Sequence, residues 1–481
     1  MENKQYIVVL EIGSSKIVGA VAMKENPQGN ISILAVEEVK TNECVRYGCI
    51  KNVEETKHYI GEVIHKLESR MNDAKISSIY LNLAGRSIRN ITTQVNRHLD
   101  VETAITQETI NSLLQEGRQV SIKGFDVFDV VPRKFMVDNV EIKKPVGTFG
   151  SDISATLNTI IGKSTLKTNL QRVIDPNIKV NNTIITPLAV ANNILSYDER
   201  QLGCMLIDFG AETTTVSIYK NDALLYLATL PLGGRNITRD IMSLNLLEDK
   251  AEELKQSIGN AMASETANNT IQVEGITVAD VSKYVVARSG EIVANINEQL
   301  NFAGIRADEL SSGIIVIGGG SYLNGFVELL DKTTKLKVRR GSYPSHVNIL
   351  DSKAQNSDLY IQAVAIATQA AEIISPEDNC LVKVENPSMP EPKKTEPTVI
   401  EQKKNEDKED NETYEKDEAK KKTKGRLSKL LDGFKNIQQF IGIDIQFLPG
   451  DILHRKDNAI FQPQQVNIHT GAGEGVFHHI A

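Results

Sequence analysis

Two short stretches, far apart in the sequence, combine the residue types that hold a phosphate group. In the first, an apolar run ends in an acid and a glycine, and small hydroxyl residues and a lysine follow: Glu11, Gly13, Ser14, Ser15 and Lys16. Glycine permits a tight turn and lets backbone N–H groups approach an anion, while hydroxyl groups add further donors. The acid would repel a phosphate directly. It can hold Mg²⁺ or its waters instead, and the ion then bridges to the phosphate.

The second stretch repeats this plan with Asp208, Gly210, Thr213 and Thr214. The segments VVLEIGSSKIVGAV (8–21) and MLIDFGAETTTVSIY (205–219) each contain an apolar strand, an acid, one residue, a glycine and a second apolar strand. Two such copies suggest two similar lobes that face each other and grip one polyphosphate, with Glu11 and Asp208 on the metal ion, directly or through water. Two ordinary hairpins with glycine turns would give the same short pattern.

Two later segments add to this pattern. GIIVIGGGSYLNGF (313–326) is a strand that runs into three glycines, where a nucleoside could lie against bare backbone. LPLGGRN is followed by an acid and a lysine at positions i and i+3 of a helix, which share a face and could reach ribose hydroxyls. These residues are Gly233, Gly234, Glu252, Lys255, Gly318, Gly319, Gly320 and Tyr322. A plain strand–helix turn and a solvated helix surface are the alternative interpretations.

The order of these four features is typical of the ATPase superfamily that contains actin, chaperones and sugar kinases. It predicts an α/β fold with two lobes that binds ATP and Mg²⁺. Short apolar runs such as YIVVLEIG, CMLIDFG and GIIVIGGG are expected to be buried strands, and VEETKHYIGEVIHKLESRM is expected to be a helix.

Composition and charge limit the partners and the cellular location that the sequence allows. The chain has 481 residues, 40% of them hydrophobic, and a net charge of -8, so bulk electrostatics argue against a nucleic-acid partner. Its four cysteines lack metal-type spacing, which indicates a reducing compartment. The first residues do not resemble a signal peptide, and the sequence contains no apolar run long enough to span a bilayer.

The C-terminal part differs in composition from the rest. Residues 376–424 are rich in Pro, Glu, Lys and Asn and poor in aliphatic residues, which predicts a disordered linker. Residues 425–441 then have apolar side chains at helical spacing beside lysines and an arginine, which predicts an amphipathic helix that binds an anionic membrane surface. The apolar stripe is Leu427, Leu430, Leu431, Phe434, Ile437, Phe440 and Ile441. A helix that packs on a folded partner is the alternative. Residues 442–481 stay unassigned.

Several blocks resemble the FtsA family of bacterial cell-division proteins: GRSIRN, VVPRKFMVDNVEIKKPVGTFGSDISATLNTIIG, TPLAVANNIL, LPLGGRNITRDI and AEELKQSIGNA. The resemblance covers residues 5 to 375. It implies an actin/DnaK-type fold with a family-specific insert in the first lobe, ATP in a central cleft, and self-association. It also implies a contact with the C-terminal tail peptide of FtsZ and other division proteins. The chain would then tether the FtsZ ring to the cytoplasmic face of the membrane at the septum.

The resemblance also implies a division of the chain. The expected parts are a first lobe (1–83 and 164–195), an SHS2-like insert for self-association and partner contacts (84–163), a second-lobe core (196–230), a small FtsZ-binding subdomain (231–310), the rest of the second-lobe core with the return to the first lobe (311–375), the linker, the membrane helix and the tail. In the small subdomain, Arg288 and Glu291 share a helix face, and Arg288 could bind a peptide carboxylate. An internal salt bridge on the helix surface is the alternative for this pair.

Two departures from the family pattern matter. Glu11 stands where the family usually has Asp, and Glu212 stands where further glycines are usual, near enough to repel a phosphate unless its side chain turns away. The sequence shows no convincing general base to orient an attacking water. Nucleotide binding with slow or negligible hydrolysis is therefore expected, and no catalytic residue is assigned. A small-molecule kinase and a pilus-assembly actin homologue are the competing hypotheses.

Overall fold

The computed structural model describes residues 4–25, 30–72, 74–263, 272–273, 275–382 and 465–467. All of them belong to one compact unit, which comprises residues 1–385 and 462–481. The membrane helix predicted for residues 425–441 and its seven apolar residues lie outside the described residues, and so does nearly all of the predicted linker.

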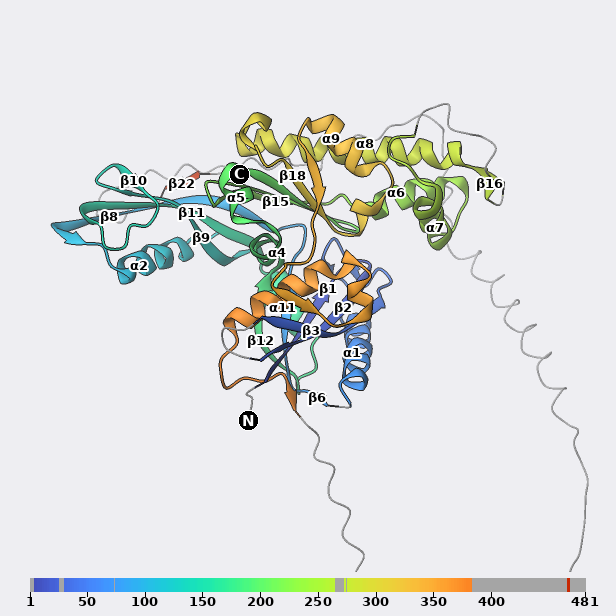
Figure 1. Cartoon of the computed structure of the whole chain (residues 1–481), viewed down its shortest axis with the longest axis horizontal. Coiled ribbons are helices and arrows are strands. Elements are labelled where there is room, and N and C mark those ends of the chain that lie inside the picture. The colour runs from blue at the N-terminus through green and yellow to red at the C-terminus, as the bar shows by residue number, and fades with distance from the viewer. Residues whose placement is uncertain are drawn as a thin grey trace, which may run out of the picture. The chain divides into compact units, whose positions relative to one another are not determined.

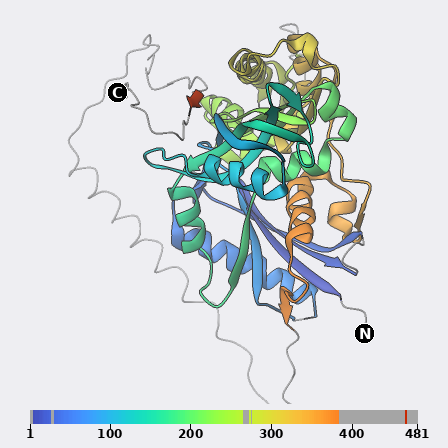
Figure 2. The ribbon, with the colours of Figure 1, turned by 90° about the vertical axis from the view of Figure 1, so that its left-hand side faces the viewer.

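The first lobe is built on a six-stranded sheet in the order β12-β7-β1-β2-β3-β20. The strands are β1 (Gln5–Ile12), β2 (Lys16–Lys24), β3 (Ile31–Lys40), β7 (Ser78–Leu83), β12 (Lys179–Ile185) and β20 (Val347–Ile349). Helix α1 (Val53–Arg70) covers one face, where its Val63 and Leu67 contact β2 at Gly19. Helix α11 (Ile361–Ile373) lies across the other face, as the blue and orange helices show (Figures 1 and 2). The helix predicted at α1 and the strand predicted at β1 are confirmed.

The second sheet runs from the inserted region into the second lobe in the order β10-β9-β11-β8-β15-β14-β13-β18-β19. The inserted strands are β8 (Arg89–Ala104), β9 (Phe125–Val137), β10 (Val140–Ile142) and β11 (Phe149–Lys163). The second-lobe strands are β13 (Cys204–Phe209), β14 (Thr214–Lys220), β15 (Ala223–Leu230), β18 (Ile314–Ile317) and β19 (Val338–Arg340). The predicted strands at β13 and β18 are confirmed. The short β22 (Gln465–Asn467) pairs in parallel with β8.

Buried amides join the inserted strands to the second lobe. Asn90 and Asn158 are buried and hydrogen-bonded to each other at 2.7 Å, and Asn90 Oδ1 accepts from the backbone N–H of Leu227 in β15 at 2.7 Å. Asn158 donates to the carbonyl of Leu224. Because buried polar groups are costly unless paired, these bonds fix the register at which the two parts of the sheet meet.

Helices cover both parts of this sheet. Helix α2 (Gln107–Arg118) packs on the inserted strands, and the second lobe carries α6 (Gly234–Ile241), α7 (Glu248–Ile258), α8 (Val278–Ala303) and α9 (Phe326–Thr334). The predicted helix at 282–300 is therefore confirmed within α8. The remaining helices are α3 (Thr165–Arg172), α4 (Thr186–Ile194), α5 (Tyr197–Leu202) and α10 (Ser352–Gln355). In the part of the chain that the structure describes, none of the helices combines the length and the apolar character needed to cross a membrane.

The folded chain continues beyond residue 375, where the sequence predicts the linker to begin. Strand β21 (Leu381–Val382) pairs with β6 (Lys75–Ile76), and the Cys380 side chain is fully buried. The Cys380 N–H also donates to the carbonyl of Tyr6 at 2.9 Å. A buried side chain, a strand pairing and a backbone hydrogen bond hold this stretch on the first lobe, although its composition resembles the linker.

Candidate functional site

The two hairpins that the sequence singles out have the same register. In β1–β2, Glu11 lies opposite Val18, and in β13–β14, Asp208 lies opposite Thr215. Each acid therefore pairs with the residue seven positions later. The acid occupies the same place in each hairpin, one residue before the end of its strand. The repeat seen in the sequence is therefore also present in the structure.

The turns of the two hairpins also match. The Gly13 N–H donates to the carbonyl of Lys16 at 3.0 Å, and the Gly210 N–H donates to the carbonyl of Thr213 at 2.9 Å. A Cβ atom at Gly13 would lie only 2.9 Å from that same Lys16 oxygen, and one at Gly210 would lie 3.1 Å from the Thr213 oxygen. Glycine therefore fits both turns because a side chain would press on the carbonyl that closes them.

Burial disfavours the ionised form of both acids unless a cation binds beside them. Burial raises the pKa of Glu11 to about 7 against the opposing pull of Lys16, and the charges of Asp208 and Glu38 add to the rise. Burial also raises the pKa of Asp208 to about 7, although Gln362 donates to both of its oxygens at 2.8 Å. Glu11 Oε2 is buried without a hydrogen-bond partner. An orphaned carboxylate oxygen near a second carboxylate fits a hard divalent cation such as Mg²⁺.

Among the described residues, no group of three or more His, Cys, Asp or Glu side chains is arranged to hold a metal ion. Mg²⁺ usually binds through one or two carboxylates and completes its shell with water and phosphate oxygens.

The glycine turn after β18 lies directly against the second hairpin. Gly318 has φ +87°, and a Cβ there would lie 2.7 Å from Asp208 Oδ1 and 2.5 Å from the Phe209 carbonyl oxygen. Only glycine tolerates both the left-handed backbone and this close approach. The first turn of α6 meets the same hairpin from another side, because the Gly234 N–H donates to the Gly210 carbonyl at 2.9 Å. The predicted glycines thus gather around Asp208.

Glu252 and Lys255 lie beside these glycines, but their side chains bind each other. Lys255 Nζ donates to Glu252 Oε2 at 2.6 Å, to Thr238 Oγ1 at 3.0 Å and to the Gly234 carbonyl at 3.2 Å. Burial lowers the pKa of Lys255 although Glu252 acts in the opposite direction. The three ammonium protons are thereby directed at three partners, and the lysine fastens α7 to the first turn of α6.

Two other predicted contact residues face aromatic or charged neighbours. Lys16 Nζ donates to Glu38 Oε2 at 2.6 Å and lies 4.5 Å from the ring centroid of Tyr360. Tyr322 is 45% exposed, and the Arg340 guanidinium carbon lies 5.2 Å from its ring centroid. An exposed aromatic ring beside the glycine turn offers a surface on which a base can stack.

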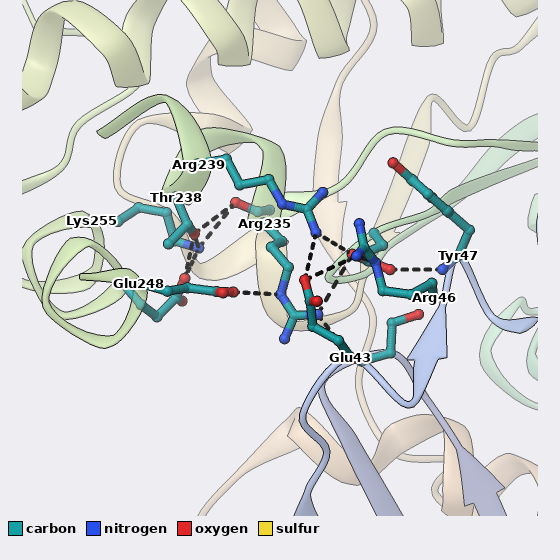
Figure 3. Close-up of polar contacts among 12 residues, drawn as sticks. Glu43, Arg46, Tyr47, Arg235, Thr238, Arg239, Glu248 and Lys255 are labelled. Carbon is teal, nitrogen blue, oxygen red and sulfur yellow. Dashed lines mark hydrogen bonds and ion pairs between the residues drawn. The ribbon is translucent and has the colours of Figure 1, made fainter. Parts of the chain in front are cut away.

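The Glu212 carboxylate lies among three arginines, Arg46, Arg235 and Arg239. Figure 3 shows these arginines converging from the two lobes. The Glu212 side chain is fully buried, and its Oε1 accepts from Arg46 Nε at 2.8 Å and from Arg239 Nη2 at 2.7 Å. Its Oε2 accepts from the backbone N–H of Tyr47 at 2.7 Å, and Arg235 Nη1 lies 3.6 Å from Oε1. Burial opposes the charged form, but these donors outweigh it and hold the pKa of Glu212 below its ordinary value.

These arginines were not predicted from the sequence. Arg46 comes from the first lobe, while Arg235 and Arg239 come from successive turns of α6 in the second. The i, i+4 spacing of the last two was a signal that they share a helix face. Nothing in the local pattern indicated Arg46, which lies 166 positions from Glu212 in the sequence.

The predicted peptide-binding pair is engaged within the second lobe. Arg288 Nε and Nη2 donate to the two carboxylate oxygens of Asp240 in α6, at 2.6 and 3.1 Å. Arg288 Nη1 donates to Glu291. The guanidinium fork is therefore filled by internal carboxylates, and a peptide carboxylate would have to compete with Asp240.

Comparison with known proteins shows which family this chain resembles. Residues 205–389 match the family model described as "Cell division protein FtsA", and residues 85–161 match the model described as "SHS2 domain inserted in FTSA". A cell division protein FtsA of Porphyromonas gingivalis is 31% identical over 347 residues, which cover 69% of this chain and 72% of that protein.

The chain belongs to the FtsA family. A second FtsA, from Neisseria meningitidis, is 30% identical over 357 residues, which cover 71% of this chain and 85% of the relative. Among solved structures, the PilM-PilN type IV pilus biogenesis complex contains a chain that superposes with a TM-score of 0.54 at 17% identity, covering 77% of this chain and 99% of that one. The FtsA fold seen here is thus the actin-like ATPase fold with the SHS2 insert, as the sequence predicted, and FtsA is a family of bacterial cell-division proteins.

Proposed function

We propose that this FtsA-family protein binds ATP with Mg²⁺ between its two glycine hairpins and acts mainly as a structural component of the division machinery. The observation that carries the proposal is the matched pair of hairpins, in which Glu11 and Asp208 occupy equivalent positions and both have a raised pKa. A Mg²⁺ ion bound there with the phosphates would neutralise the charge that burial disfavours.

In this proposal the backbone N–H groups and hydroxyls of the two turns would hold the phosphates. Gly319, at which an added Cβ would meet only Leu359 among the described residues within 4 Å, would leave bare backbone for the nucleoside, and Tyr322 offers an exposed ring. Gln362 holds the Asp208 carboxylate by two hydrogen bonds and so keeps it oriented toward its site. No side chain here is assigned as a general base, so hydrolysis is slow at most and nucleotide binding serves assembly.

We further propose that the protein assembles with FtsZ and with copies of itself, and anchors the FtsZ ring to the cytoplasmic face of the inner membrane at the septum as a peripheral protein. Family membership supports the division role, and the apolar and basic pattern of residues 425–441 supports the anchor. One such helix binds weakly, but assembly places many on one surface, and avidity then makes attachment firm. The surface of α8 around Arg288 is proposed to receive the FtsZ C-terminal tail.

The test uses the full chain and a version that ends at residue 382. Both are titrated with ATP in the presence and absence of Mg²⁺, and both are pelleted with vesicles that contain anionic lipid, with and without FtsZ. We expect equal Mg²⁺-dependent ATP binding by both, and vesicle and FtsZ-ring attachment by the full chain alone. Absence of ATP binding would refute the nucleotide site, and equal pelleting of the two chains would refute the anchor.

A further inference from the structure

A single turn of the first lobe contacts both phosphate hairpins. It joins β4 (Val45–Arg46) to β5 (Cys49–Ile50) and consists of Tyr47 and Gly48. The Gly48 N–H donates to Ser14 Oγ in the first hairpin at 2.9 Å. The neighbouring Tyr47 N–H donates to Glu212 Oε2 in the second hairpin at 2.7 Å. Two consecutive backbone donors thus reach one hairpin each.

The turn is held in a conformation that its sequence does not favour. Tyr47 has φ 53° and Gly48 has φ 69°, so both central residues are left-handed. Glycine adopts this region freely, but a bulky tyrosine rarely does, so the surroundings must hold it there. The Tyr47 carbonyl accepts from the Arg86 N–H at 3.1 Å, and the Tyr47 N–H is fixed by Glu212. The second lobe thereby supplies the hydrogen bond that fixes the Tyr47 N–H.

Part of the compensation for the Glu212 charge comes from the other lobe. A fully buried carboxylate is costly unless it is paired and hydrogen-bonded. The Arg46 guanidinium and the Tyr47 N–H come from the first lobe, and they provide two of the three short bonds to Glu212. Separation of the lobes would break both bonds and would leave Glu212 with Arg239 and the more distant Arg235.

A second contact crosses in the opposite direction. Arg235 Nη1, from α6 of the second lobe, donates to the Ser14 carbonyl of the first hairpin at 3.1 Å. Its Nε is held by Glu248 of the same lobe at 2.9 Å. Arg235 is therefore aimed at the first hairpin by a carboxylate that does not itself cross between the lobes.

We propose that Glu212 is a positioning residue that fastens the Arg46–Gly48 turn of the first lobe onto the second hairpin and so keeps the two lobes closed around bound nucleotide. We call Glu212, Arg46, Tyr47 and Arg239 the Glu212 clasp. The inference rests on the proposed nucleotide site and adds to it the device that sets how long the nucleotide stays. The clasp acts through the turn and through Ser14.

The turn also links the clasp to the base of the insert. A Cβ atom at Gly48 would lie 2.7 Å from the Cα of Gly85, and the Arg86 N–H is bonded to Tyr47. Residues 85 and 86 lead directly into β8. Opening of the clasp therefore exposes amides on both sides of this contact, and hydrogen exchange reports it without any nucleotide.

The test compares Glu212→Gln with Glu253→Gln in the full chain. Both variants remove one negative charge from the second lobe, but Glu253 is exposed and pairs with Lys250 of its own helix, whereas Glu212 is bonded across the lobes. We expect Glu212→Gln to speed hydrogen–deuterium exchange of residues 46–48 and 86 by about tenfold or more, since a bond to a charged group is lost. We expect a similar rise in the dissociation rate of a fluorescent ATP analogue with Mg²⁺. Glu253→Gln should stay within about twofold of wild type in both readouts, because an exposed ion pair contributes little.

Equal effects of the two variants on dissociation would mean that charge alone matters and would overturn the clasp. So would unchanged exchange at residues 46–48 in Glu212→Gln. If Glu212→Gln does not fold, Arg46→Gln is the second variant. It removes the Arg46–Glu212 bond by changing the partly exposed arginine, and it should raise both the hydrogen-exchange rate of the turn and the dissociation rate of the nucleotide. If wild type binds no nucleotide, the proposed function fails, while the exchange comparison still decides whether Glu212 fastens the turn.

Discussion

The two glycine hairpins, β1–β2 and β13–β14, have the same register, but their turn residues make different contacts. In the first, Ser14 gives its hydroxyl oxygen to the Gly48 N–H of its own lobe and its carbonyl to Arg235 of the other lobe. In the second, Glu212 sends a charged side chain across to Arg46 and Tyr47. Each hairpin therefore contributes one contact that crosses between the lobes, through a neutral backbone group in one case and a buried charge in the other.

This difference shows how one supersecondary unit serves two tasks. The acid at the strand end and the glycine after it are the same in both copies, and they form the proposed metal and phosphate site. The residues after the glycine are free to differ, and in the second hairpin Glu212 connects the lobes. The contact made by the buried Glu212 carboxylate is lost when the lobes separate and also when the carboxylate is protonated. The contact made by the Ser14 carbonyl is lost only when the lobes separate.

The largest expected effect comes from breaking the charged side of this comparison. Glu212→Gln should lower the free energy of unfolding by about 3 kcal/mol near neutral pH, because it removes the buried carboxylate that three partly buried arginines share. The pKa of Glu212 is depressed in the folded state, so its contribution is complete above the unfolded value and is lost as pH falls through the folded one. Urea unfolding at neutral and at acidic pH should therefore show the deficit shrinking in acid.

Ser14→Ala is the corresponding side-chain change in the first hairpin. It removes the hydroxyl that accepts from the Gly48 N–H and leaves the carbonyl that Arg235 contacts across the lobes. The loss of this neutral acceptor should cost about 1 kcal/mol and show no dependence on pH over the same range. A deficit in Glu212→Gln that is equally large in acid would contradict the assignment of an ionised Glu212 to the clasp.

The next effect concerns the part that the two hairpins share. If Glu11 and Asp208 serve one cation, Glu11→Gln and Asp208→Asn should each weaken Mg²⁺-dependent ATP binding by about 10- to 100-fold. The double variant should be little worse than either single variant, because the ion is already lost. Calorimetric titration with Mg·ATP and with metal-free ATP measures this. Fully additive losses would show that the two acids act separately.

The smallest effect has the opposite sign to that of Glu212→Gln. Burial raises the pKa of Glu11 to about 7, so without metal the folded state disfavours its charge. Stability should fall as pH rises from the ordinary value of a glutamate toward 7, since the folded state holds the extra proton in that window. Glu11→Gln should then stabilise the metal-free protein by about 1 kcal/mol at about pH 8. Thermal unfolding in a chelator measures it, and a destabilised variant would contradict the origin of the raised pKa.

The elements of the fold followed from local patterns. Apolar runs that end in an acid and glycine gave β1 and β13, and helical spacing gave α1 and α8, because side-chain periodicity acts over a few residues. The composition of residues 376–382 favoured a linker, yet Cys380 is buried and β21 is paired, because a partner strand 300 positions away decides their state. The alternative for Arg288, an internal ion pair, likewise depends on Asp240, 48 positions away.

The sequence by itself determined the two hairpins, the position of the acid and glycine in each, and the family, since these are written in contiguous residues. The direction of the Glu212 side chain was decided only by the tertiary structure. In the sequence it is an acid beside a phosphate turn and predicts repulsion. In the fold, Arg46 and the Tyr47 N–H of the other lobe surround it, and the energy of a buried charge is set by neighbours that chain folding brings together.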